Sequence, residues 1–369
     1  MKILRPILIV ASCLTFAANA AAQISLTPPG VDTPPADKSA AKAKPAMAAK
    51  KPPAPAATPN PAAPAATAKP AAKPAAPTAT VTPAPAPDDP RVDLVFGAYQ
   101  RGQYKTAFDL ASKRAQDNHD PKAMTMLGEL YANAMGIKRD YAKAADWYTR
   151  AADAGDREGM FALAMLRLSG RGGAVNREEA VKLLASSAKL GNPKAAYNLA
   201  LLYLDGQTLP QDLTRAAELL RLAADAGNPE AQYALATFYK EGTGVKKDLD
   251  MAVRLLQAAS LADNVDAEVE YAIALYNGTG TPKNEAAAIA LLRKAAKQNS
   301  PIAQNRLARV LVTGQGVPMD KVEGFKWHIV AKTAGRGDPM LDEALAGLSA
   351  EDRAKAQEGA RKWIGNNSK

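Results

Sequence analysis

The chain has 369 residues, which is too long for one small domain and suits one or two. Its hydrophobic content of 47% is enough for a buried core, although much of it is Ala and only 5% of the residues are aromatic. The formal net charge of +10 does not indicate a nucleic-acid-binding domain, because residues 1–22 carry +2, residues 23–87 carry +5, and only +3 remains for residues 88–369.

Residues 1–22 are predicted to be a secretory signal peptide. The basic residues Lys2 and Arg5 precede a short apolar stretch, and the run of small residues that follows fits a cleavage site. The apolar stretch is too short to span a bilayer, so we expect a periplasmic or secreted protein without a transmembrane span. The alternative is a lipoprotein anchored through Cys13, because the letters VASC that end there resemble a bacterial lipobox. Cys13 is the only cysteine, which excludes structural disulfides within the chain.

Residues 23–87 form a Pro-, Ala- and Lys-rich segment that we expect to be a disordered linker. Its composition offers little apolar area to bury, so nothing offsets the entropy of ordering it. Pro-Ala runs favour an extended polyproline conformation, which suits a tether that holds a folded domain away from a surface. The alternative is that its lysines touch anionic polymers or lipids of the cell envelope.

From residue 120 onward the sequence repeats with a period of 36 residues. The clearest column holds Asp or Asn, the side chains that best cap the start of a helix. Its members are Asp140, Asn176, Asp212, Asp248, Asn284 and Asp320. A small residue follows four positions later and a large apolar residue three positions after that, which predicts a capped helix that packs closely against a neighbour.

Each repeat also contains a second helical pattern and two breaks. One helix ends in a Gly-x-Gly loop in most repeats, and the other ends near a residue type that tolerates the left-handed conformation. The latter residues are Gly155, Gly191, Gly227, Asp263, Asn299 and Gly335. One unit is therefore predicted to be a helix, a glycine loop, a capped helix and a tight turn.

The pattern A-x-x-x-L-A-x-x-Y, followed by G-x-G-V-x-x-D and later by A-A-x-x-G-N-P, resembles the Sel-one-like repeat, a branch of the tetratricopeptide-like helical repeats. The resemblance implies an all-α fold, a right-handed superhelical α-solenoid. It covers residues 120–338 as six repeats. Residues 88–119 resemble an ordinary tetratricopeptide unit. Residues 339–369 are expected to form capping helices, with Ser349 at a helix start and Trp363 closing the open apolar end.

The chain departs from the family pattern in a few places. The third repeat has Gly206-Gln207-Thr208 in place of Gly-x-Gly, and the fifth repeat is interpreted as having one extra residue in its first helix or one fewer in its loop. Many relatives staple their helices with paired cysteines. This chain cannot do so, and any function tied to those cysteines is not implied for it.

The sequence contains no arrangement that indicates catalysis, a metal site or a cofactor. The only imidazoles are His119, in a turn, and His328, in an interior packing column where we expect a partly buried packing residue. The Gly-x-Gly loops follow helices rather than a strand, so we interpret them as turns and not as phosphate sites. Glu178 and Glu179 lie in the first turn of a helix, where negative charge favours the helix dipole.

The candidate partner-binding residues lie on the first helices, which line the concave side of a solenoid of this kind. The register of the family places an aromatic column there, with apolar neighbours one turn on. The candidates are Phe161, Met165, Tyr197, Leu201 and Tyr233. Such a column suits a peptide or a helix of a partner protein. The alternative is that the rings pack against the second helix of their own repeat.

We therefore expect a non-enzymatic scaffold or adaptor in the bacterial cell envelope that binds an unidentified protein. The family that the chain resembles mostly serves as adaptors, including envelope regulators and factors used in host interaction. The same resemblance implies one alternative, an enzyme or binder that acts on peptidoglycan or β-lactams, as proposed for cysteine-rich relatives. A further alternative is attachment to peptidoglycan or lipid through residues 23–87.

Overall fold

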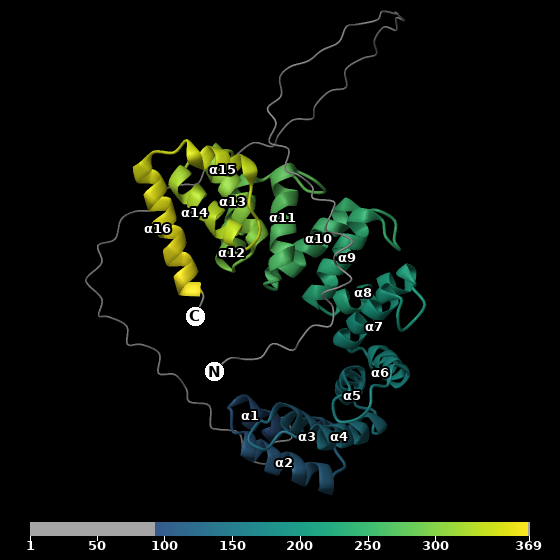
Figure 1. The fold of residues 1–369 in the computed structure, drawn as a ribbon. Helices are drawn as coiled ribbons and strands as arrows, with labels where there is room; N and C mark the ends of the chain where they lie inside the picture. Colours follow the sequence, from purple (N-terminus) through teal and green to yellow (C-terminus); the bar gives the residue numbers. More distant parts are fainter. Residues whose placement is uncertain (1–92, 368–369) are drawn as a thin grey trace, which may run out of the picture. The chain divides into compact units, whose positions relative to one another are not determined.

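The computed structural model describes residues 93–367 of the chain (Figure 1). Within this range it contains sixteen helices and no strand, which confirms the all-α prediction. The predicted signal peptide at residues 1–22 and the predicted linker at residues 23–87 lie outside the described residues. No helix in the described range is long and apolar enough to cross a membrane.

Six pairs of helices carry the repeat, and each pair has a first and a second helix. The first helices are α3 (Pro121–Asn133), α5 (Arg157–Ser169), α7 (Pro193–Asp205), α9 (Pro229–Glu241), α11 (Val265–Asn277) and α13 (Pro301–Thr313). The second helices are α4 (Tyr141–Asp153), α6 (Arg177–Lys189), α8 (Leu213–Asp225), α10 (Leu249–Leu261), α12 (Glu285–Lys297) and α14 (Lys321–Thr333). Each helix has 13 residues and begins 36 residues after its counterpart in the preceding pair, as the sequence period predicts.

Four further helices flank these pairs. They are α1 (Leu94–Gln100) and α2 (Tyr104–Asp117) before them, and α15 (Pro339–Ala346) and α16 (Ala350–Asn367) after them. Helix α16 packs along α14, and there the rings of Trp327 and Trp363 meet edge to face with their centroids 5.0 Å apart. The backbone N–H of Asp352 donates to the hydroxyl oxygen of Ser349 at 3.1 Å. The expected serine cap is confirmed, and Trp363 contacts the last second helix through Trp327.

The predicted caps explain where the repeat helices begin and end. At the start of every second helix, the Asp or Asn side chain accepts a hydrogen bond of 2.8–3.0 Å from the backbone N–H three residues later. The first helices α5 to α13 end at glycines with positive φ, from Gly170 to Gly314. The turns after the second helices also contain a left-handed residue, which is non-glycine at Asp263 and Asn299, as expected.

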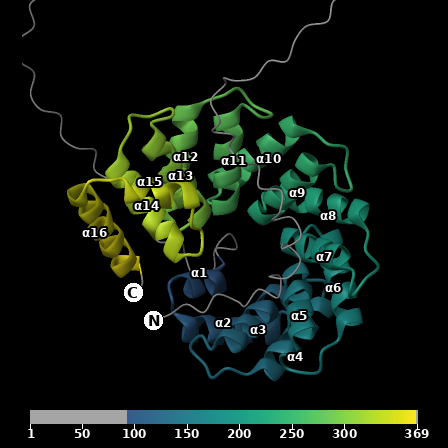
Figure 2. The same cartoon turned by 45° about the horizontal axis from the view of Figure 1, so that its top comes forward.

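Small side chains between the helices let the repeats stack closely. The alanine four residues after each second-helix cap is buried, from Ala144 to Ala288, and Gly324 takes this place in the last repeat. Each repeat helix packs against the next one along the chain (Figures 1 and 2). The helix pairs thus form an α-solenoid, in which a repeat makes its contacts with its neighbours.

The interpretation of the fifth repeat is wrong. Helix α11 has the same 13 residues as α9, and its C-cap Gly278 follows Gly242 by 36 residues, so there is no insertion or deletion. The sequence misled because Tyr271 lies two positions after the place that Tyr233 has in its own repeat. Val269 occupies that place instead and is buried.

Candidate partner-binding face

The first helices turn the same positions away from the core. In α7, for example, Ala195, Ala196 and Leu199 are buried, whereas Lys194 and Tyr197 keep exposed surface. Helical periodicity places the second, fifth, sixth and ninth residues on one face, which we call the first-helix face. In α5 to α11 its members are Glu158, Phe161, Ala162, Met165, Lys194, Tyr197, Asn198, Leu201, Glu230, Tyr233, Ala234, Thr237, Asp266, Val269, Glu270 and Ile273. All of them except Val269 have solvent-accessible surface.

All five candidate residues belong to the first-helix face. Phe161 and Tyr197 are half-buried and pack against the apolar core shared by α5 to α9, and Tyr233 packs against the core between α9 and α11. Met165 is exposed and Leu201 is half-buried. The rings rest on the core with part of their surface and leave the rest accessible. That these side chains bind a partner stays a prediction.

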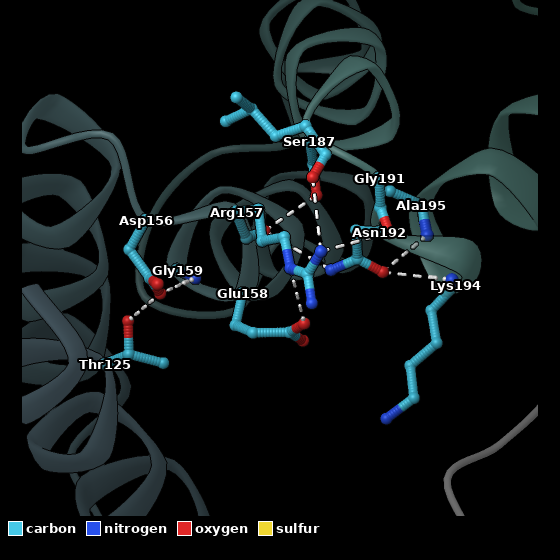
Figure 3. A network of polar contacts seen from close by, with 11 residues as sticks. Thr125, Asp156, Arg157, Glu158, Gly159, Ser187, Gly191, Asn192, Lys194 and Ala195 are labelled. Carbon is cyan, nitrogen blue, oxygen red and sulfur yellow. Dashed lines mark hydrogen bonds and ion pairs between the residues drawn. The ribbon is translucent and has the colours of Figure 1, made fainter. Parts of the chain in front are cut away.

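Hydrogen bonds at the helix starts tie consecutive first helices together (Figure 3). The Oδ2 atom of Asp156, which caps α5, accepts from the backbone N–H of Gly159 at 2.7 Å. The same atom accepts from the hydroxyl of Thr125 on α3, also at 2.7 Å. One carboxylate therefore both starts a helix and links it to the first helix of the preceding repeat.

Asn192 makes the equivalent link between α5 and α7 (Figure 3). Its Oδ1 accepts from two backbone N–H groups at the start of α7, and its Nδ2 donates to the carbonyl oxygen of Arg157 at 3.4 Å. The hydroxyl of Ser187 donates to the same carbonyl at 2.7 Å. These bonds set the spacing of α5 and α7, and with it the spacing of the aromatic side chains that the two helices carry.

Carboxylates lie near both tyrosine rings. Burial raises the pKa of the Tyr197 phenol, and the negative charge of Glu230 on the next first helix raises it further. Burial also raises the pKa of Tyr233, and Glu270 and Asp266 on α11 add to the effect. Sequence reasoning missed these acids. They occupy the second and sixth positions of the first helices, columns that become visible once the repeats are aligned every 36 residues.

The face becomes more charged from α9 to α11. The Nζ of Lys240 lies 3.0 Å from Oε2 of Glu270, which joins the two helices by an ion pair. The pKa of the Asp266 carboxyl is raised, first by burial and second by the nearby charge of Glu270. On α5 and α7 the first-helix face therefore carries apolar and aromatic side chains next to Glu158 and Lys194, and on α9 and α11 it carries acids beside an aromatic ring.

The two histidines and Glu179 lie outside the first-helix face. Among residues 93–367, no group of three or more His, Cys, Asp or Glu side chains is arranged to hold a metal ion. His328 lies in its packing column, where it is fully buried rather than partly buried as expected, and its Nε2 lies 2.8 Å from Oδ1 of Asp342. His119 is exposed in the turn before α3. The carboxylate of Glu179 accepts from Asn176, the residue that caps its helix.

The fold and the face define a helical repeat protein of the α-solenoid class. The Sel1 repeat family matches six consecutive segments, which are residues 121–156, 157–192, 193–228, 229–264, 265–300 and 301–335. These matches cover more than half of the chain, and the chain belongs to the Sel1 repeat family, as its sequence pattern indicated. No protein with curated annotation matches it.

Solved structures support the same assignment. A Sel1 repeat protein from Oxalobacter formigenes is 26% identical, with a TM-score of 0.58 over 65% of this chain and 98% of that chain. The Escherichia coli protein c5321, described as a protective antigen of uropathogenic strains that displays an SLR fold, is 23% identical with a TM-score of 0.61. That match covers 75% of this chain and 64% of the E. coli chain, and it shows the fold alone.

Proposed function

We propose that this protein is a non-enzymatic adaptor of the bacterial cell envelope that binds a peptide or a helix of a partner protein on its first-helix face. Sel1 repeat proteins are generally protein-interaction scaffolds, which supports the general class. The observation that carries the choice of site is the row of Phe161, Tyr197 and Tyr233 on three consecutive first helices, with the exposed Met165 beside it. Rings that already rest on a packed core lose little conformational freedom when a partner covers them, so they are suitable anchors.

A photo-crosslinking amino acid in place of Met165 tests the site. Met165 on α5 is 37% exposed, and Leu222 on the second helix α8 is 44% exposed, so Leu222 is a control of similar accessibility in the other helix layer. We expect envelope proteins to crosslink to position 165 and not to position 222. The crosslink should disappear when Tyr197→Ala and Tyr233→Ala are combined, with helix content retained in circular dichroism. Equal crosslinking from both positions contradicts the proposed face.

The envelope setting is a separate part of the proposal. It is supported by the signal-peptide pattern of residues 1–22, which lie outside the described residues. Its test is to determine the N-terminus of the full-length protein recovered from a fractionated bacterial cell. A chain that begins near residue 23 supports soluble export, and a lipid-modified Cys13 supports the lipoprotein alternative. A chain that keeps residues 1–22 in the cytoplasmic fraction contradicts both.

A further inference from the structure

The acids beside the tyrosine rings indicate the chemistry of the partner. Five residues occupy the second, fifth or sixth positions of consecutive first helices and so share the first-helix face, namely Tyr197 on α7, Glu230 and Tyr233 on α9, and Asp266 and Glu270 on α11. The ion pair of 3.0 Å between Lys240 and Glu270 joins α9 to α11 there. The charge of Glu230 acts on Tyr197, and the charges of Asp266 and Glu270 act on Tyr233. We name these five residues the acidic-aromatic patch. We propose that the patch binds a lysine or arginine side chain carried by an extended segment of the partner polypeptide. This inference rests on the proposed function and specifies the kind of sequence that the partner presents.

The negative charge of the patch is only partly balanced within the described residues. Lys240 forms an ion pair with Glu270, and the charge of Arg306 on α13 also acts on Glu270. The side chains of Glu230 and Asp266 form no hydrogen bond or ion pair within residues 93–367. Two carboxylates of the patch therefore remain available to a cation from outside, which is the charge complementarity that selects a basic partner over an acidic one.

Asp266 lies four residues before Glu270 on the same face of α11, so the two carboxylates are close neighbours. Its neighbours remove part of the water around its carboxyl group, and Glu270 adds a like charge, which together raise its pKa. A lysine or arginine head group beside Asp266 offsets both the lost solvation and the like charge. It replaces lost solvation of Asp266 and neutralises the repulsion between Asp266 and Glu270.

Tyr233 provides a second contact for the same side chain. Its ring packs against the buried cluster that contains Ala236 and Ala267, and part of its surface stays accessible. A cation is attracted to the face of a tyrosine ring. Lysine and arginine also carry an apolar stem, which covers the ring while the charged head reaches a carboxylate.

The rest of the face adds an apolar requirement. Phe161 and Met165 on α5 and Leu201 on α7 form its apolar part, and Glu158 and Lys194 lie beside them. An extended chain advances about 3.3 Å per residue, so a segment that reaches from α11 or α9 to α7 or α5 spans several residues. Such a segment therefore carries an apolar residue several positions from the basic one.

The experiment selects binders from displayed random peptides of about twelve residues, long enough to cross α5 to α11 when extended. The full-length protein is the target, and the enriched peptides are synthesised for affinity measurement. We expect the enriched peptides to contain a lysine or arginine and, several positions away, an apolar residue. Asp266→Asn should weaken binding by about five- to tenfold, the effect of one partly exposed charge pair. Asp225→Asn, which alters an exposed carboxylate on the second helix α8, should leave the affinity unchanged.

Three outcomes separate this inference from the proposed function. Basic peptides that lose affinity with Asp266→Asn support both. Peptides that require Tyr197 and Tyr233 but contain no basic residue, or bind Asp266→Asn as well as the original protein, overturn the inference and leave the adaptor function standing. The absence of any enriched peptide, or binding that survives the combined Tyr197→Ala and Tyr233→Ala changes, overturns both.

Discussion

The ammonium group of Lys294 on α12 reaches the fully buried carboxylate of Glu268 on α11, with 2.6 Å between Nζ and Oε1. Lys294 also lies 2.7 Å from Oδ1 of Asp263, in the turn that precedes α11. A buried carboxylate is costly unless it is paired, and this lysine is its ion-pair partner. The buried charge of Glu268 on α11 therefore depends on Lys294 of the next helix, α12, for its ion pair.

The neighbouring repeats hold a neutral amide in the place of Glu268. Gln232 and Gln304 each donate through Nε2 to a backbone carbonyl of the preceding second helix, at 3.1 Å. We therefore expect Glu268→Gln to raise the free energy of unfolding by up to about 1 kcal/mol, because an amide has a ready acceptor and no charge to bury. Urea unfolding followed by circular dichroism measures the change. If Glu268→Gln instead lowers the free energy of unfolding, the attraction within the ion pair is larger than the free energy lost by desolvating its charges.

The complementary change removes the cation. Lys294→Met leaves Glu268 buried without its partner, and we expect the free energy of unfolding to fall by about 3 kcal/mol. In the double variant with Glu268→Gln most of this loss should be recovered, because no buried charge remains. Two independent, additive effects in the same urea titrations contradict this coupling.

Gly244 is expected to be essential to the loop after α9. Its φ is +63°, and a Cβ atom at this position would overlap the backbone carbonyl of Leu213 at the start of α8. Gly227 has φ +82° but open space around it, so Gly227→Ala measures the cost of the left-handed conformation alone, about 1 kcal/mol. Gly244→Ala should cost about 3 kcal/mol, because the backbone of α8 must also move. Thermal midpoints of the two variants check this, and equal values contradict the close approach.

Asn192 should contribute more than a helix cap. Both Asn192 and Asn228 cap a first helix, and loss of the cap costs about 1 kcal/mol in each case. Asn192 is buried and also donates to Arg157 of the preceding repeat. Asn192→Ala should therefore lower the free energy of unfolding by about 0.5–1 kcal/mol more than Asn228→Ala does. Chemical denaturation of the two variants gives the difference, and a larger effect at Asn228 is the contrary result.

The contact between α14 and α15 should weaken in acid. Lys332 first, and His328 second, lower the pKa of Asp342 from its usual 3.8. A carboxyl whose pKa is lower in the folded state stabilises that state above its unfolded pKa, and the contribution disappears as the pH falls below about 3.8 through the folded value. Thermal midpoints measured from about pH 6 down to about pH 3 should fall more for the original protein than for Asp342→Asn. Asp109→Asn, at an exposed position of α2, should follow the original protein. Parallel curves for all three contradict the role of Asp342.

The period of 36 residues was sufficient to place the repeat helices, because each boundary depends on neighbours in the chain. An Asp140 side chain caps the backbone three residues later, and Gly170 ends a helix through its own φ. The error in the fifth repeat arose because Val269 takes the position that Tyr233 has on α9. The aromatic residue is replaced there, but the register of the helix is the same. Hydrophobic identity alone does not distinguish such a replacement from a shift in register.

The sequence by itself determined the repeat helices, their caps and the family pattern, because these follow from interactions within a few residues and from a repeated spacing. The resemblance to the family implied the face on which the candidate aromatic residues lie. The tertiary structure alone decided which charges meet. Lys294 reaches Glu268, Asp342 reaches His328, and Asp266 lies near Tyr233 only because successive helices bring them together. The rise and rotation from one repeat to the next set these distances, and no pattern along the chain specifies them.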